Sequence, residues 1–114
     1  MSPQIPEPDW KLLRTLREAA LQRAIVRALD ESAALIADES RTPSERYHAL
    51  HDLLRARDRV IASAFDAPSR SNAMLQLMQL HALGLLREDE ISRFTPETRG
   101  RLRVPSPEVA SNGS

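Results

Sequence analysis

Residues 9–41 read DWKLLRTLREAALQRAIVRALDESAALIADESR, and this stretch decides the fold class. It contains neither proline nor glycine, the two residues that interrupt helices most strongly. From Leu21 the apolar spacing alternates between four and three, a coiled-coil pattern: Leu21, Ile25, Ala28, Ser32 and Leu35. A second stripe lies beside the first: Val26, Leu29, Ala33 and Ile36. The stretch predicts a helix from Asp9 of about 30 residues, or about 45 Å.

Two apolar stripes on one long helix predict a second copy of the chain. The 114 residues leave room for one modest core. The rest of the molecule is too small to cover both stripes over that length. We therefore expect an elongated helical homodimer, whose interface includes Leu21, Ile25, Leu29 and Leu35.

The remaining sequence predicts shorter helices. Thr42-Pro43-Ser44-Glu45 is a strong helix start, with a threonine cap, a proline in the first turn and a glutamate that completes a capping box. The expected core positions of this helix are Tyr47, Leu50, Leu53, Leu54, Val60, Ile61, Ala64 and Phe65. Another helix is expected over residues 69–83, ending at Gly84 as its C′ residue. Short helices around 88–93 and 95–102 complete an all-α fold.

This pattern predicts one helical domain over residues 9–103. Residues 1–8 hold three of the eight prolines and are expected to be a disordered lead. The tail from residue 104 to 114 is expected to be disordered because of its composition.

Composition excludes several classes of function. Sixteen basic and sixteen acidic side chains give a formal net charge of zero, which disfavours nucleic acid or an anionic membrane as the main partner. Cysteine is absent, so neither disulfides nor thiolate metal sites can form. No apolar run approaches the roughly 20 residues of a membrane span, and the N-terminus lacks a signal-peptide layout. We expect a cytoplasmic protein without a cofactor.

His48, His51 and Asp52 are the candidate residues for metal binding or catalysis. Their spacing places two imidazoles and a carboxylate on one side of a helix, which can suit a metal ion. A structural site needs about four ligands, and His81 is the only other histidine. The chain also lacks a nucleophile elbow and a glycine-rich phosphate loop. A polar patch without a metal, on a protein that is not an enzyme, is the favoured interpretation.

A small helical DNA-binding transcriptional regulator is the alternative. Short helices in the second half carry Arg87, Arg93, Arg99, Arg101 and Arg103, an arrangement compatible with a helix-turn-helix. Neighbouring acidic residues, Glu88, Asp89, Glu90 and Glu97, neutralise most of that charge. A solvated surface of mixed sign is therefore favoured over a DNA interface.

Met74, Leu75, Leu77 and Met78 form an apolar stripe on the predicted third helix. Such a stripe usually belongs to a core. Part of it can instead be an exposed, adaptable docking surface.

Several short motifs resemble the fluorescence recovery proteins of cyanobacteria. They comprise Leu50-His51-Asp52-Leu53-Leu54, Ala56-Arg57, Ile61, Phe65-Asp66, Ser71, Gln79-Leu80, Gly84-Leu85 and Glu90. That family carries a Leu-His-Asp motif on its second helix, followed by an aromatic-Asp pair fourteen residues on. The resemblance covers roughly residues 47–102.

The resemblance implies a non-enzymatic regulator. Members of that family are helical homodimers that bind the C-terminal domain of photoactivated orange carotenoid protein and speed its return to the resting form. The implied partner-binding residues are His48, His51, Asp52, Arg55, Asp58, Leu75 and Leu77. The family has a tryptophan where this chain has His48, and a basic residue where it has Asp58. The natural partner is accordingly an orange carotenoid protein, a homologue of its C-terminal domain, or a different protein.

Overall fold

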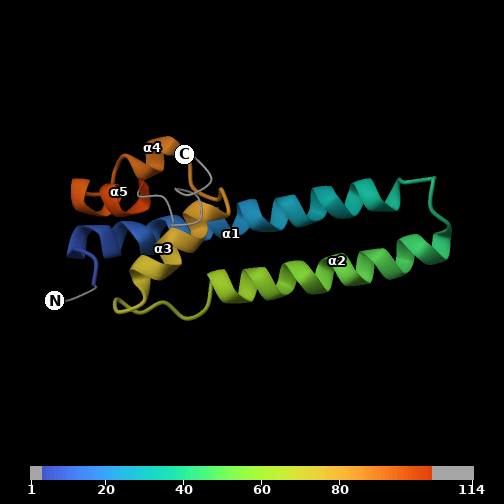
Figure 1. Cartoon of the computed structure of the whole chain (residues 1–114), viewed down its shortest axis with the longest axis horizontal. Helices are drawn as coiled ribbons and strands as arrows, with labels where there is room; N and C mark the ends of the chain where they lie inside the picture. The colour runs from blue at the N-terminus through green and yellow to red at the C-terminus, as the bar shows by residue number, and fades with distance from the viewer. Residues whose placement is uncertain (1–3, 104–114) are drawn as a thin grey trace, which may run out of the picture. The chain divides into compact units, whose positions relative to one another are not determined.

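The computed structural model describes residues 4–103, and over that range the fold is all-helical with no strand (Figure 1). The helices are α1 (Glu7–Ile36), α2 (Pro43–Ala64), α3 (Ala73–Ala82), α4 (Glu88–Ile91) and α5 (Pro96–Arg103). The predicted fold class, a long N-terminal helix followed by shorter helices, is confirmed at this level.

Helix α1 has the predicted length of 30 residues, but it begins and ends earlier than expected. The carbonyl of Pro6 accepts hydrogen bonds from the N–H groups of Asp9 and Trp10, both at 3.0 Å, so Asp9 lies inside the first turn. Ile5 is buried, with 1% of its surface exposed. The predicted disordered lead therefore does not extend over residues 4–8. Residues 1–3, and the predicted tail from 104 to 114, lie outside the described residues.

The chain divides into two compact units, where the sequence predicts one domain. The terminal unit consists of described residues 4–16 and 68–103, and the hairpin unit is Arg17–Ala67. Helix α1 contributes to both units.

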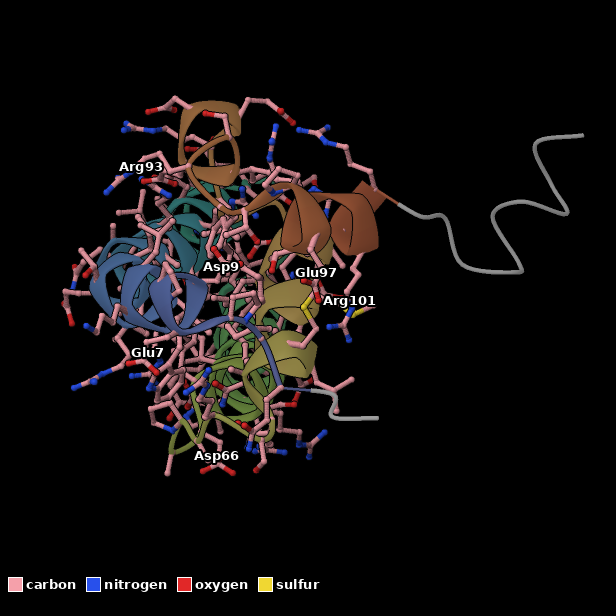
Figure 2. All side chains as sticks on the ribbon, turned by 90° about the vertical axis from the view of Figure 1, so that its left-hand side faces the viewer. Glu7, Asp9, Asp66, Arg93, Glu97 and Arg101 are labelled. Atoms are coloured by element: carbon pink, nitrogen blue, oxygen red, sulfur yellow. The ribbon has the colours of Figure 1, made fainter. Side chains whose placement is uncertain are left out.

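The terminal unit holds the core of large apolar side chains. Its buried members are Ile5, Leu13, Leu16, Met74, Leu77, Leu80, Leu85, Leu86, Ile91, Phe94 and Leu102. A buried polar cluster lies among them: the Asp9 carboxylate accepts from the backbone N–H of Thr95 at 2.9 Å and from the hydroxyls of Thr95 and Thr98. Figure 2 shows Asp9 inside this unit, whereas Glu7 and Arg93 lie at its surface. Asp9 thus holds the beginning of α5 against the beginning of α1.

Helix α3 ends at a glycine, as the sequence predicts. Gly84 has a φ of 71°, in the left-handed region that glycine adopts without strain. The N–H of Leu85 donates to the carbonyl of Leu80 at 3.0 Å, and that of Gly84 donates to His81 at 2.9 Å. This pair of bonds is a Schellman motif, which satisfies the last carbonyls of the helix.

The hairpin unit consists of the rest of α1 and all of α2, side by side and antiparallel (Figure 1). Polar contacts join the two helices at three levels. Arg17 donates to the carbonyl of Phe65 at 2.9 Å, Arg57 forms a two-point pair with Glu31 at 2.7 Å, and Arg46 donates to the carbonyl of Ile36 at 2.6 Å. These contacts define the register of the hairpin.

The hairpin unit buries no large apolar side chain. Its buried residues are small: Ala20, Ala28, Ser32 and Ala64. The predicted core stripe of α2 is therefore wrong in part, since Tyr47, Leu54 and Val60 are exposed. A two-helix hairpin can enclose only one narrow strip of each helix, and α2 carries more apolar residues than that strip holds.

The four residues of the predicted dimer interface differ in their exposure. Leu21, Ile25 and Leu35 are half-buried in the single chain, on the same stripe as the buried Ala28 and Ser32. That stripe is partly covered within one chain. Of the four predicted interface residues, only Leu29 is largely exposed, at 60%.

Candidate functional site

Helix α2, which carries most of the candidate residues, begins at a capping box. The Thr42 hydroxyl accepts from the N–H of Glu45 at 3.1 Å, and the Glu45 carboxylate accepts from the N–H of Thr42 at 2.8 Å. This is the predicted capping box, with Pro43 at the first helical position. The candidate residues of α2 all face solvent: His48, His51, Asp52, Arg55 and Asp58 are exposed.

An aromatic cluster lies on this surface. The ring of Tyr47 makes edge-to-face contacts with His48, at 5.6 Å between centroids, and with His51, at 5.2 Å. Tyr47 is 62% exposed, although the sequence predicts a core position. Exposed aromatic groups with polar edges are typical anchors of protein interfaces. Tyr47 and Leu54 are seven residues apart, so they share one side of α2, and that side lies off the stripe that faces α1. This shared side is the signal that separates both residues from the core.

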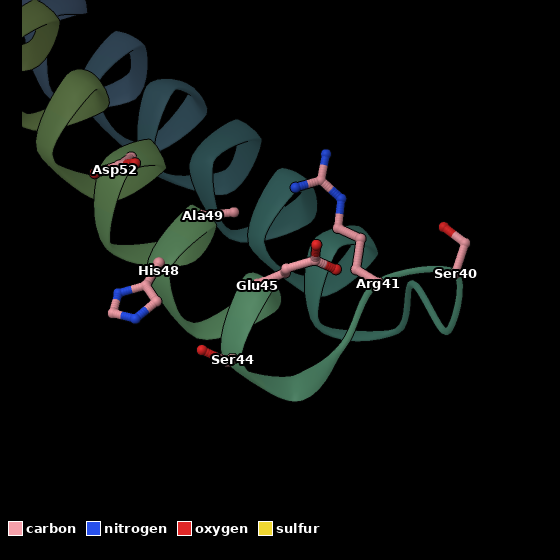
Figure 3. Close-up of a pocket in the computed structure, with 7 residues that line it drawn as sticks. All are labelled: Ser40, Arg41, Ser44, Glu45, His48, Ala49 and Asp52. Atoms are coloured by element: carbon pink, nitrogen blue, oxygen red, sulfur yellow. The ribbon is translucent and has the colours of Figure 1, made fainter.

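A shallow, open depression lies at the end of the hairpin where α1 and α2 are connected (Figure 3). It is lined by Ser40, Arg41, Ser44, Glu45, His48, Ala49 and Asp52. The hydroxyl and backbone N–H of Ser40 lower the pKa of Asp38 from its usual value, and Arg41, 3.2 Å away, adds to the effect. Figure 3 shows the His48 ring turned away from Glu45 and Arg41, so these groups do not converge on one point.

A metal site is not assembled in the part of the chain that the structure describes. Within residues 4–103, no group of three or more His, Cys, Asp or Glu side chains is placed to hold a metal ion. The helical spacing of His48, His51 and Asp52 brings these residues to one side of α2, but no further ligand joins them there.

Over residues 4–103, no helix has both the length and the apolar character to cross a membrane.

Helix α3 separates its apolar residues into buried and exposed sets. Leu77 is fully buried and Met74 is 4% exposed, whereas Leu75 is 71% exposed and Met78 is 42% exposed. Residues two apart on a helix lie about 200° apart, so Leu75 and Leu77 cannot face one partner together. Leu77 is therefore a core residue, contrary to the prediction that it binds a partner. Met78, which the predicted stripe includes but the predicted partner-binding residues omit, is exposed. The candidate residues of α3 and of α2 belong to different units.

The arginine-rich second half carries compensating acids. Arg87 lies 3.2 Å from Asp89, and Arg103 lies 3.2 Å from Glu88. Helix α4 has only four residues and α5 has eight. Helices of one or two turns provide little length for reading a major groove. The geometry does not favour the DNA-binding alternative.

The chain matches no protein-family model, no curated protein and no solved structure. Among residues 4–103, eight large apolar side chains are exposed, six of them on the hairpin unit: Val26, Leu29, Ile36, Tyr47, Leu54 and Val60. The other two, Leu75 and Met78, belong to α3.

Proposed function

We propose that this protein is a non-enzymatic regulator that acts as a homodimer and binds another protein, in the manner of the fluorescence recovery proteins that its sequence resembles. One observation carries the proposal. The hairpin unit exposes six large apolar side chains while burying none. Large exposed apolar surface is typical of a protein interface. The solvent-facing cluster of Tyr47, His48 and His51 adds an anchor of the kind that interfaces use.

A protein of this kind needs no reactive group to change the rate of a conformational reaction. It accelerates the return of its partner to a resting state if it binds the transition state more tightly than the activated state. Binding energy at exposed side chains supplies that difference. The α2 residues His48, His51, Asp52, Arg55 and Asp58, together with Leu75 of α3, are the proposed contacts with the partner.

The proposed partner is the C-terminal domain of an orange carotenoid protein or a homologue of that domain. The motif Leu50-His51-Asp52 and the pair Phe65-Asp66 support this assignment through the resemblance alone. His48 replaces an aromatic anchor of the family, and such a loss typically costs about 2 kcal/mol at an interface centre. Asp58 reverses a charge, which adds repulsion or desolvation cost. We therefore expect retained binding and weak acceleration.

The test measures red-to-orange relaxation of photoactivated orange carotenoid protein, with and without this protein, and complex formation by gel filtration. A micromolar complex with little acceleration is expected. In the same assay, Leu75→Ser should weaken the complex about tenfold or more, because a large exposed contact is lost. Ala82→Ser, an exposed position on the same helix, is the matched control and should change little.

Two outcomes would change this account. Acceleration as strong as that of the family would show that His48 and Asp58 are tolerated replacements. Absence of both complex and acceleration would refute the assignment of the partner.

A further inference from the structure

We propose that one face of the hairpin binds the same face of a second copy of this chain. The face consists of Val26, Leu29, Ala33 and Ile36 on α1, with Tyr47 and Leu54 on α2; we name it the hairpin face. This inference rests on the homodimer of the proposed function and deepens it, because it keeps Leu29 of the predicted interface but moves the contact from the stripe of Leu21, Ile25 and Leu35 to the neighbouring stripe and to α2.

Burial and the ion pair between Glu31 and Arg57 show which side of each hairpin helix faces the other helix. We call this side the inward side. On α1, Ala28 is buried and Glu31 reaches Arg57 of α2. On α2, Arg57 and the buried Ala64 mark the side that meets α1. Helical rotation can then be counted from these positions on both helices.

Five of the six exposed large apolar residues of the hairpin unit lie on the same side of the hairpin, and Val60 lies toward the other side. At about 100° per residue, the stripe centred between Leu29 and Ala33 lies about 140° round from the inward side of α1. Tyr47 and Leu54 lie about 80° round from the inward side of α2, in the same rotational sense. For two antiparallel right-handed helices, rotation in the same sense leads to the same side of the pair. The hairpin face is therefore one continuous surface.

The opposite side of the hairpin is charged. It carries the exposed residues Arg27 and Asp30 on α1 with Glu45, Asp52 and Arg59 on α2. The α1 part of the hairpin face carries no charged side chain between residues 25 and 36. On α2, His51 and Asp58 lie at its outer edge. This division matches an interface with an apolar centre and a polar rim.

A second copy is the occupant that the dimensions and the charge favour. The hairpin part of α1 is about 30 Å long and α2 about 33 Å, and two packed helices are roughly 20 Å wide. One side of the hairpin thus offers roughly 600 Å² per copy, near the roughly 800 Å² per partner of a standard stable interface. A two-fold interface places a surface against itself, which an uncharged stripe allows without opposing like charges.

Two neighbouring alanines provide the sharpest test. Ala33 belongs to the hairpin face and Ala34 to the charged side, and both are exposed. The chain has no cysteine, so Ala33→Cys and Ala34→Cys each give a single site for a nitroxide spin label. We expect the label at residue 33 to be immobilised in the full-length dimer and the label at residue 34 to stay mobile. Equal mobility at the two sites, or immobilisation at residue 34 alone, would overturn the proposal.

A charge-insertion pair gives the second measurement. The double variant Leu29→Glu, Leu54→Glu should raise the dimer dissociation constant by about a hundredfold or more, because the new charges would be buried only in the dimer. Its circular dichroism spectrum should stay helical. Ala34→Glu with Ala56→Glu adds the same charges to exposed positions on the other side and should leave the constant within about threefold. A larger increase of the dissociation constant for the Ala34 and Ala56 variant than for the Leu29 and Leu54 variant would overturn the proposal. Both tests use this protein alone, so their failure is distinct from failure to bind a carotenoid protein.

Discussion

The carboxylate of Asp9 is 1% exposed and accepts hydrogen bonds from the N–H of Thr95 and the hydroxyls of Thr95 and Thr98. These donors come from the start of α5. Asp9 and Thr95 are 86 positions apart in sequence, so one side chain links the first helix to the last. Buried donors without an acceptor are costly, because their hydration is lost without replacement.

Replacement of Asp9 by alanine should therefore lower the free energy of unfolding substantially. We expect a loss of about 3 kcal/mol, because three hydrogen bonds disappear and the Thr98 hydroxyl stays buried without this acceptor. Urea unfolding followed by circular dichroism measures it. Asp30→Ala, at an exposed position of the same helix, should cost less than about 0.5 kcal/mol. Similar losses in the two variants would show that the Asp9 cluster is not stabilising.

Glu31 gives a prediction about pH. Its hydrogen bond from Arg57 lowers the pKa of the Glu31 carboxyl from the usual 4.5, and the charge of Arg57 adds to this effect. Because the folded pKa lies below the unfolded one, the pair stabilises the hairpin above pH 4.5, and this contribution disappears as pH falls through the folded pKa. Arg57→Gln should accordingly make the unfolding free energy less dependent on pH between about pH 6 and about pH 3. The effect should be small, since both side chains are exposed. An unchanged pH dependence would contradict this assignment.

At the scale of elements, local chemistry predicts helix ends well where the cap lies in the sequence itself. The capping box of Thr42 and Glu45 and the C′ glycine at Gly84 are both confirmed. Helix α3 begins four residues later than predicted, at Ala73, because Ser69 and Asn72 form a turn in which the Asn72 side chain accepts from the N–H of Ser69 at 3.1 Å. Helix α1 begins two residues early. The beginning of α1 is held by long-range contacts, such as the hydrogen bond from Arg70 to the carbonyl of Ile5, and no local sequence pattern predicts such contacts.

The cap of α2 can be tested by removing one side chain. Thr42→Ala should lower the unfolding free energy by about 1 kcal/mol, since the N–H of Glu45 loses its acceptor. Thr42→Ser keeps the oxygen and should retain most of the stability. Thermal unfolding of the three proteins under matched conditions makes the comparison. Equal stability of the alanine and serine variants would show that the hydroxyl is not the stabilising group.

At the scale of the whole molecule, the sequence predicts that α1 has more apolar surface than one chain can cover, but not which stripe stays uncovered. The predicted interface draws on both stripes, with Leu21, Ile25 and Leu35 from the stripe of coiled-coil spacing and Leu29 from its neighbour. In the structure the stripe of Leu21, Ile25 and Leu35 is half-buried within the hairpin unit, while Val26, Leu29 and Ile36 remain exposed. Periodicity shows that two stripes exist, whereas the pairing with α2 decides which one is covered.

We propose that this protein works through association, beginning with association of two copies. Sedimentation equilibrium of the full chain, across concentrations from low to high micromolar, measures that association. We expect a mass of twice the 12.8 kDa of one chain, with dissociation only toward the lowest concentrations. A mass of 12.8 kDa at every concentration would contradict it, because the exposed apolar side chains of the hairpin unit would then be stable in water without a second copy.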